Sequence, residues 1–147
     1  MSTRVRQRSA SPGVDAERLG SAITALVRAT RREIALPLGA STIAALRTIA
    51  AQGPLRTGDL ARHERVAGPS LSRIVAVLED EGHVVRTADT GDRRVVWLEA
   101  TESGRRLLDD VARERARVFE GRVARLTPEQ AASLAAALDA LEALATD

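Results

Sequence analysis

The chain has 147 residues, 44% of them hydrophobic, which fits one globular domain and excludes an intrinsically disordered chain. Because it has no cysteine, disulfides, thiol sensors and zinc–thiolate sites are excluded. The formal net charge of +2 is no argument for nucleic-acid binding, since Arg4, Arg6 and Arg8 alone account for the excess of basic residues.

The sequence has no sign of a membrane or export segment. No apolar run approaches the roughly 18 residues that a membrane-spanning helix needs. The N-terminal letters MSTRVRQRSASPG contain no apolar segment of a signal peptide. We therefore expect a cytoplasmic protein with no membrane partner, and residues 1–14 are expected to form a flexible basic tail.

A first helix is predicted from Asp15 to about Leu36, where Pro37 ends it. Apolar residues recur along it at helical spacing. This stripe consists of Leu19, Ile23, Leu26, Val27 and Ile34. Ser41 is then expected to cap a shorter helix that runs through about Ala51.

The next segment predicts a helix–turn–helix. Thr57 is expected to cap a short helix that runs to about Glu64, and the letters RVAG then form a turn. A second helix is predicted from Pro69 to about Glu81, with Gly82 as its stop. Two short helices joined by a short turn that contains glycine are typical of this motif.

The second of these helices has two different faces. The apolar face consists of Leu71, Ile74, Val75 and Leu78. The opposite face consists of Pro69, Ser72, Arg73, Ala76 and Asp80. Its N-terminal half is small and polar, as a helix in the major groove requires, because bulky side chains would hold the backbone away from the base edges. The alternative is an ordinary amphipathic helix whose polar side faces water.

Two valine-rich runs flank the letters TADTGDRR, so residues 83–100 predict a β-hairpin with DTG at its tip. Arg93 and Arg94 then enter the return strand, where guanidinium groups suit a narrow minor groove. Asp92 shares a strand face with Arg94, so its carboxylate is expected to fix the direction of an arginine. A charged edge that blocks strand aggregation is the alternative, but it gives no reason for the helix–turn–helix directly before the hairpin.

Two further helices are predicted after the hairpin. The first starts at Thr101, and the second starts with a capping box of Thr127 and Gln130 around Pro128. The last helix carries an apolar seam of Leu134, Leu138, Leu141 and Leu144. This seam and the stripe of the first helix are more apolar surface than one small winged domain covers, so we expect a homodimer.

From about residue 41 to 108, the chain resembles the multiple antibiotic resistance regulator (MarR) family. The wing signature of that family is Asp-x-Arg, then five residues, then Leu-Thr. Here it reads DRRVVWLEAT from Asp92 to Thr101, with Ala100 in place of leucine. The letters LSRIVAVLEDEGHVVR resemble the recognition helix and first wing strand. The resemblance implies DNA contacts from Ser70, Ser72 and Arg73, with Arg86 near the phosphates.

The resemblance implies a mainly α fold with a small β-hairpin wing, in which dimerisation helices flank a winged helix–turn–helix domain. It further implies a homodimer on a pseudo-palindromic operator, usually a repressor that a small aromatic or phenolic ligand releases. The expected parts are the tail (1–14), an N-terminal dimerisation helix (15–40), the winged domain (41–100) and C-terminal dimerisation helices (101–147). The dimerisation candidates are Leu19, Ile23, Leu134, Leu138, Leu141 and Leu144.

Other functions have less support. We expect no enzyme and no cofactor, because the chain has no G-x-S-x-G, phosphate loop or cysteine nucleophile. A metal-responsive regulator would use His63 with Asp59 and Glu64, although we expect no metal site. A winged protein-interaction module would favour aromatic or aliphatic anchors, whereas this face is small and polar. The ligand is not predicted; Arg28 and Arg47 are the weak candidates for pairing with an anionic one.

Overall fold

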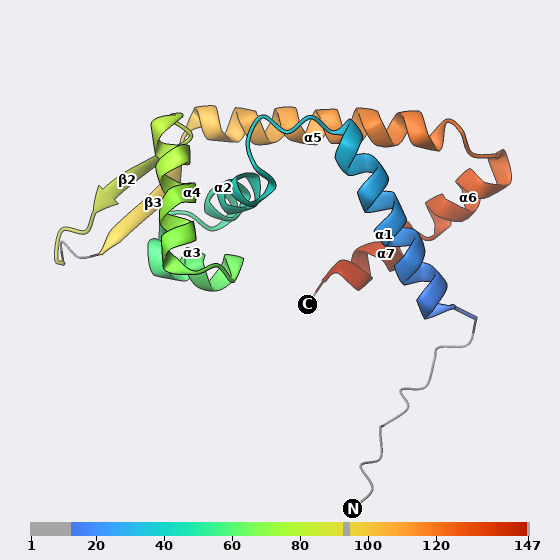
Figure 1. The fold of residues 1–147 in the computed structure, drawn as a ribbon, viewed down its shortest axis with the longest axis horizontal. Coiled ribbons are helices and arrows are strands. Elements are labelled where there is room, and N and C mark those ends of the chain that lie inside the picture. The colour runs from blue at the N-terminus through green and yellow to red at the C-terminus, as the bar shows by residue number, and fades with distance from the viewer. Residues whose placement is uncertain (1–12, 93–94, 147) are drawn as a thin grey trace, which may run out of the picture. The chain divides into compact units, whose positions relative to one another are not determined.

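The computed structural model of the chain describes residues 13–92 and 95–146 (Figure 1). It divides into two compact units, Met1–Ala35 and Leu36–Asp147. The described residues are mainly helical with one small sheet, which confirms the predicted fold class. Within the described ranges, no helix combines the length and the apolar character needed to cross a bilayer.

The first unit contains one described helix, α1 (Ala16–Glu33). Asp15 caps it, because its carboxylate accepts a hydrogen bond from the backbone N–H of Arg18 at 3.0 Å. The helix ends at Glu33, three residues before the predicted end, since Ile34 already has an extended backbone. The predicted helix is therefore confirmed with a shorter C-terminal end.

The second unit begins with a helix–turn–helix and a three-stranded sheet. Its elements up to the long helix are α2 (Ala40–Gln52), β1 (Leu55–Arg56), α3 (Thr57–Glu64), α4 (Gly68–Asp80), β2 (Val84–Ala88), β3 (Val96–Ala100) and α5 (Glu102–Val123). The strand order is β1-β3-β2, and both pairs are antiparallel. Leu98 at the centre of β3 pairs with Leu55 on one side and with Arg86 on the other.

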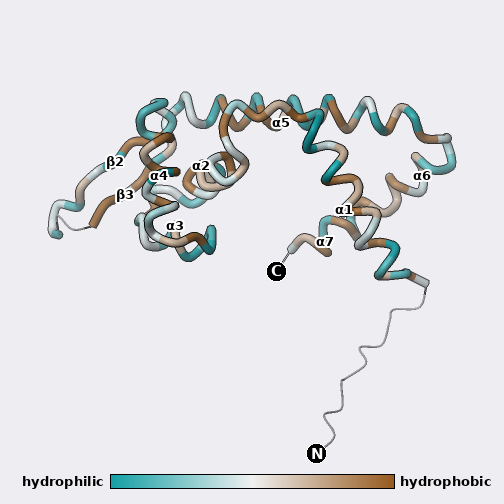
Figure 2. Tube along the Cα trace, in the orientation of Figure 1, coloured by the Kyte–Doolittle hydropathy of each residue, from teal (hydrophilic) through white to brown (hydrophobic). Residues whose placement is uncertain are grey.

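Apolar side chains of the helices and the sheet meet in one core. Leu46 on α2, Leu78 on α4 and Leu98 on β3 are fully buried in it. Burying one such side chain contributes roughly 1.5 to 3 kcal/mol to folding. Figure 2 shows the hydrophobic residues along β3 and on the adjacent helices. On α4, Leu71 and Val75 are also buried and Ile74 is half-buried, so the predicted inner face is confirmed.

Thr101 ties the wing to the long helix. Its hydroxyl accepts a hydrogen bond from the N–H of Gly104 at 3.1 Å and donates one to the carbonyl of Gly82 at 2.7 Å. Its own N–H donates to the carbonyl of His83 at 3.0 Å. Gly82, the predicted helix stop, has a φ of +73°, which favours glycine. Ala100 is buried despite replacing the larger leucine of the family signature.

Two predicted helix caps are wrong, and one strand was not predicted. Gly39, not Ser41, is the N-cap of α2, and its carbonyl accepts the first hydrogen bonds of that helix. Thr57 lies inside α3, because the chain passes from the strand residue Arg56 directly into the helix. The two-residue strand β1 has no alternating pattern that a sequence could reveal.

The C-terminal segment forms α6 (Pro128–Ala136) and α7 (Leu138–Ala145). The predicted capping box is present, with Gln130 N–H donating to the Thr127 hydroxyl and Thr127 N–H donating to the Gln130 side chain. The prediction of one continuous last helix is wrong, since a turn at Ala137 separates α6 from α7. The predicted leucine seam is therefore divided, with Leu134 on α6 and the other three leucines on α7.

Candidate nucleic-acid interface

The outer face of α4 is exposed. Pro69, Ser70, Ser72 and Arg73 are exposed at its N-terminal half, on the side opposite the buried leucines. Ala76 is half-buried, and Val77 is an exposed apolar residue that sequence reasoning did not place on this surface. The small, polar N-terminal end of the helix is therefore accessible and could enter the major groove of DNA.

The N-terminus of α4 has no side-chain cap. Its N-cap residue is Ala67, which offers no oxygen to the first N–H groups of the helix. Such N–H groups, together with the helix dipole, favour an anion such as a DNA phosphate. The Ser72 hydroxyl donates a hydrogen bond to the carbonyl of Gly68 at 3.0 Å, so only its acceptor lone pairs stay available to a partner.

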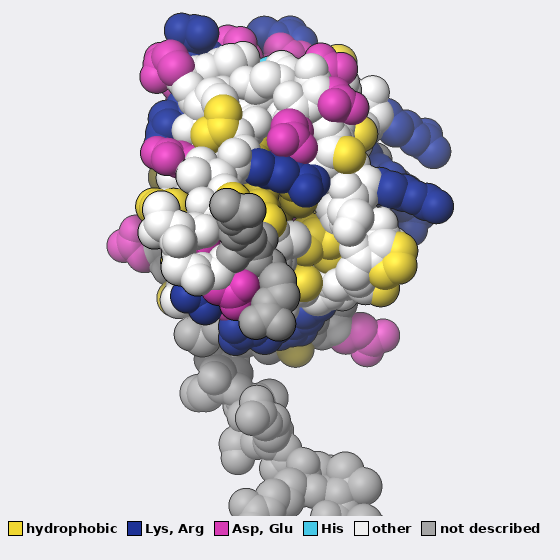
Figure 3. All heavy atoms as spheres, turned by 90° about the vertical axis from the view of Figure 1, so that its left-hand side faces the viewer, with side chains coloured by type: hydrophobic (Ala, Val, Ile, Leu, Met, Phe, Trp, Pro, Cys, Tyr) yellow, Lys and Arg dark blue, Asp and Glu magenta, His cyan; other side chains and the backbone are white. Residues whose placement is uncertain are grey.

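Arg86 lies on β2 and is ion-paired with Glu79 on α4, with 2.8 Å between Arg86 Nε and Glu79 Oε2. Both side chains are partly exposed. Figure 3 shows the face of the molecule that carries the wing. On it, arginine side chains (dark blue) lie beside exposed hydrophobic side chains (yellow). The residue that the resemblance places near phosphates is therefore accessible but held by an acid in the free protein.

Arg93 and Arg94, the predicted minor-groove residues, lie outside the described residues. Asp92 is described, and its carbonyl accepts a hydrogen bond from the N–H of Val95 at 2.8 Å. The direction of an arginine by its carboxylate stays a prediction.

The wing turn is held by Asp89, a residue that sequence reasoning treated only as part of the tip. Its carboxylate accepts hydrogen bonds from the N–H groups of Gly91 and Asp92, and from the indole Nε1–H of Trp97 on β3. These bonds, the Trp97 bond first, lower the pKa of Asp89 from its ordinary value, and the positive charge of Arg56 adds to the effect. The bond to Trp97 crosses the hairpin, so only the strand register could have revealed it.

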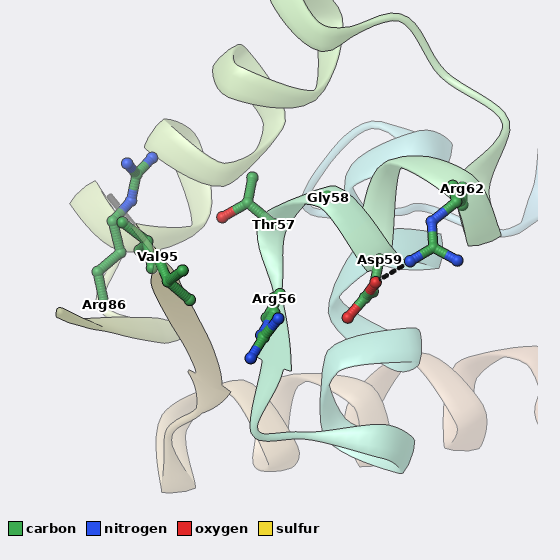
Figure 4. A pocket seen from close by; sticks show the side chains of 8 residues that line it. Arg56, Thr57, Gly58, Asp59, Arg62, Arg86 and Val95 are labelled. Carbon is green, nitrogen blue, oxygen red and sulfur yellow. Dashed lines mark hydrogen bonds and ion pairs between the residues drawn. The ribbon is translucent and has the colours of Figure 1, made fainter. Parts of the chain in front are cut away.

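A shallow pocket of about 460 Å³ lies between α3 and the wing (Figure 4). Three arginines line it, but they point in different directions. Arg62 forms an ion pair with Asp59, Arg86 points toward α4, and Arg56 points away from both. Since the guanidinium groups do not converge, the pocket does not present a single anion site.

The predicted dimerisation residues lie on α1, α6 and α7. Leu138 is 50% exposed and Leu144 is 67% exposed within the single chain. Ile23 and Leu134 are also exposed, and Leu19 and Leu141 are half-buried. These large apolar side chains stand in water unless another surface covers them.

The ligand and metal candidates gain no support. Arg28 on α1 and Arg47 on α2 are both exposed. In the described ranges, no group of three histidine, cysteine, aspartate or glutamate side chains could hold a metal ion. Near His63, the Glu64 carboxylate accepts a hydrogen bond from the Thr48 hydroxyl at 2.6 Å, while Asp59 pairs with Arg62.

The sequence and the fold match known proteins. The pattern of the MarR family matches residues 38–96. The helix–turn–helix-type transcriptional regulator Mb0904 of Mycobacterium bovis is 35% identical over 127 residues, which cover 86% of this chain and 89% of that protein. The chain belongs to the MarR family. Its fold is accordingly that of the family's winged helix–turn–helix transcriptional regulators.

Two solved structures share this fold. A transcriptional regulator from Pseudomonas aeruginosa PA01 is 31% identical, has a TM-score of 0.75, and aligns over 90% of this chain and 94% of its own. Streptococcus pneumoniae FabT, solved in complex with DNA, has a TM-score of 0.64 at 19% identity over 88% of this chain and 96% of its own, so it shows the shared fold alone.

Proposed function

We propose that this MarR-family protein is a homodimeric, sequence-specific DNA-binding regulator that places α4 in the major groove and the β2–β3 wing in the adjacent minor groove. The main support for this proposal is the exposed N-terminal end of α4. Ser70, Ser72 and Arg73 face outward there, while Leu71 and Val75 anchor the helix in the core. Small residues at this end let the backbone approach base edges, which an arginine can then reach.

The wing would supply the second contact. Its sequence carries Arg93 and Arg94 directly after the turn, and Arg86 lies on its first strand. We infer that Arg94 enters the minor groove, whose negative potential attracts guanidinium groups. Asp92, two residues earlier in the sequence, would direct that arginine, because it is an acid on a surface where DNA would repel it.

A homodimer would cover the exposed leucines of α6 and α7 and the apolar stripe of α1. Two identical subunits related by a two-fold axis also explain how one chain reads inverted half-sites. Release by a small aromatic or phenolic ligand, and action as a repressor, are predictions from the family resemblance alone.

The proposal is tested by mapping the DNA that the purified full chain retains from genomic fragments of its source and by footprinting it. We expect inverted half-sites about 10 base pairs apart, centre to centre. The affinity should fall with salt, with a log–log slope near −0.9 for each phosphate neutralised. No retained DNA, or an affinity independent of salt, would contradict the proposal and favour the protein-interaction module.

A further inference from the structure

The two carboxylate oxygens of Asp89 serve different parts of the wing. Oδ1 accepts hydrogen bonds from the backbone N–H groups of Gly91 at 2.9 Å and Asp92 at 3.1 Å. This is a local turn contact, in which an aspartate side chain bonds the backbone two and three residues ahead. Oδ2 accepts a hydrogen bond from Trp97 Nε1–H at 2.9 Å. One carboxylate therefore holds the turn and joins it to the opposite strand.

The contact to Trp97 is an addition to the backbone pairing of the hairpin. The regular strand pairs end at Ala88 and Val96. Beyond them, two backbone hydrogen bonds continue the hairpin. The N–H of Asp89 donates to the carbonyl of Val95 at 3.0 Å, and the N–H of Val95 donates to the carbonyl of Asp92 at 2.8 Å. The indole–carboxylate bond adds a side-chain link across this end of the hairpin.

Trp97 is itself held in place. The guanidinium carbon of Arg56 lies 4.9 Å from the centre of a Trp97 ring, a cation–π distance, and Arg56 pairs with Trp97 in the β1–β3 register. The ring therefore has a cation against one face and an acceptor at its N–H. This chain of contacts connects the wing turn to β1 and thus to the start of α3.

We propose that Asp89 and Trp97 are positioning residues for DNA binding: their hydrogen bond fixes the wing turn, and with it the direction in which the chain leaves Asp92 toward the two wing arginines. The inference rests on the proposed function, because it concerns the wing as a DNA contact. Ordering a loop during binding costs entropy and so lowers affinity. A turn that is already fixed in the free protein avoids this cost when it binds DNA.

Because Asp89 is charged, a pure charge effect and a positioning role predict opposite changes in DNA affinity when the charge is removed. A carboxylate on a DNA-facing turn repels phosphates, so removing its charge should strengthen binding if charge were all that mattered. Loss of the positioning bond should instead weaken binding. The bond to Trp97 has a charged acceptor, but only part of its energy is transmitted to DNA binding, so we expect a change of about three- to tenfold in affinity.

Two variants remove the cross-hairpin bond in different ways. In Asp89→Asn, the amide oxygen can still accept from Gly91 and Asp92, but its NH₂ group then faces the indole N–H, so only the bond to Trp97 is lost. Trp97→Phe keeps an aromatic ring and removes the donor. Asp80→Asn is the control, because it removes the same charge from an exposed end of α4.

The experiment measures binding of the full-length variants to the footprinted operator fragment by fluorescence anisotropy. We expect Asp89→Asn and Trp97→Phe each to bind about three- to tenfold more weakly, and the double variant to bind no more weakly than either. Asp80→Asn should bind as tightly as the wild type or more tightly. Dimer mass should not change and the melting temperature should fall only slightly, since Asp89 lies outside the core.

Each outcome decides one question. Equal or tighter operator binding by Asp89→Asn, or additive effects in the double variant, would overturn the positioning role while leaving DNA binding intact. A wild-type chain that binds no DNA would refute the proposed function itself. The wing contact has its own readout, because the single indole N–H resonance of the only tryptophan should move in Asp89→Asn.

Discussion

Arg86 Nε on β2 lies 2.8 Å from Glu79 Oε2 on α4, so this ion pair links strand β2 to helix α4. Both side chains are partly exposed, and such pairs are weak in water. If Arg86 meets a phosphate, as the family resemblance implies, the phosphate and Glu79 compete for the same guanidinium group. Glu79 is then an intramolecular competitor of DNA.

Glu79→Gln should therefore strengthen DNA binding by a factor of about two to five, since it frees Arg86 and removes an acid that repels phosphates. Binding of the operator fragment at two salt concentrations measures this. Glu120→Gln on α5 removes an equal charge from another exposed position and should change affinity less. Weaker binding by Glu79→Gln would show that the pair positions Arg86 for DNA instead.

Arg73→Ala should cost about 1 to 3 kcal/mol of operator binding and relax the preference at one half-site position, if Arg73 reads a base. Competition with operators changed one base pair at a time measures both effects. Arg115→Ala, at an exposed position of α5, is the charge-matched control. If all sequences lose affinity equally, Arg73 contacts only phosphates.

Sequence periodicity predicted the elements whose pattern is local. The inner face of α4 and the Thr127–Gln130 capping box were confirmed because each depends on residues within one or two helical turns. The break at Ala137 was missed, since alanine is a strong helix former and leaves no signal for a turn. The Asp89–Trp97 bond was missed because it depends on the register of two strands.

Replacing Leu138 and Leu141 on α7 by aspartate should yield monomers or insoluble protein, because each leucine buried at a dimer interface is worth roughly 1.5 to 3 kcal/mol. Light scattering measures the mass. Val14→Asp is the control, since Val14 is an exposed apolar residue before α1. A well-folded dimer of the double variant would refute the role of α7 in dimerisation.

The contacts of Asp89 also predict a pH dependence. Hydrogen bonds from Trp97, Gly91 and Asp92 lower its pKa in the folded chain, so its contribution to stability is fully present above the pKa of an unfolded aspartate and is lost as the pH falls through the lower, folded pKa. Fluorescence of Trp97 should therefore stay constant down to the ordinary aspartate range and change only below it. Asp89→Asn should lack this transition; an identical titration in both proteins would contradict the assignment.

Gly104 on α5 tests how closely the long helix must approach the wing. A Cβ at this position would lie 2.3 Å from the carbonyl oxygen of His83 and 3.1 Å from Leu46 Cδ1. Since the first of these is backbone, Gly104→Ala must displace the helix and should cost about 1 to 3 kcal/mol in the free energy of unfolding. Gly121→Ala, in the same helix with nothing within 4 Å of its Cβ, should instead stabilise by about 0.5 to 1 kcal/mol. Urea denaturation of both variants measures the contrast, and equal stabilities would mean that α5 can move away from His83 without loss.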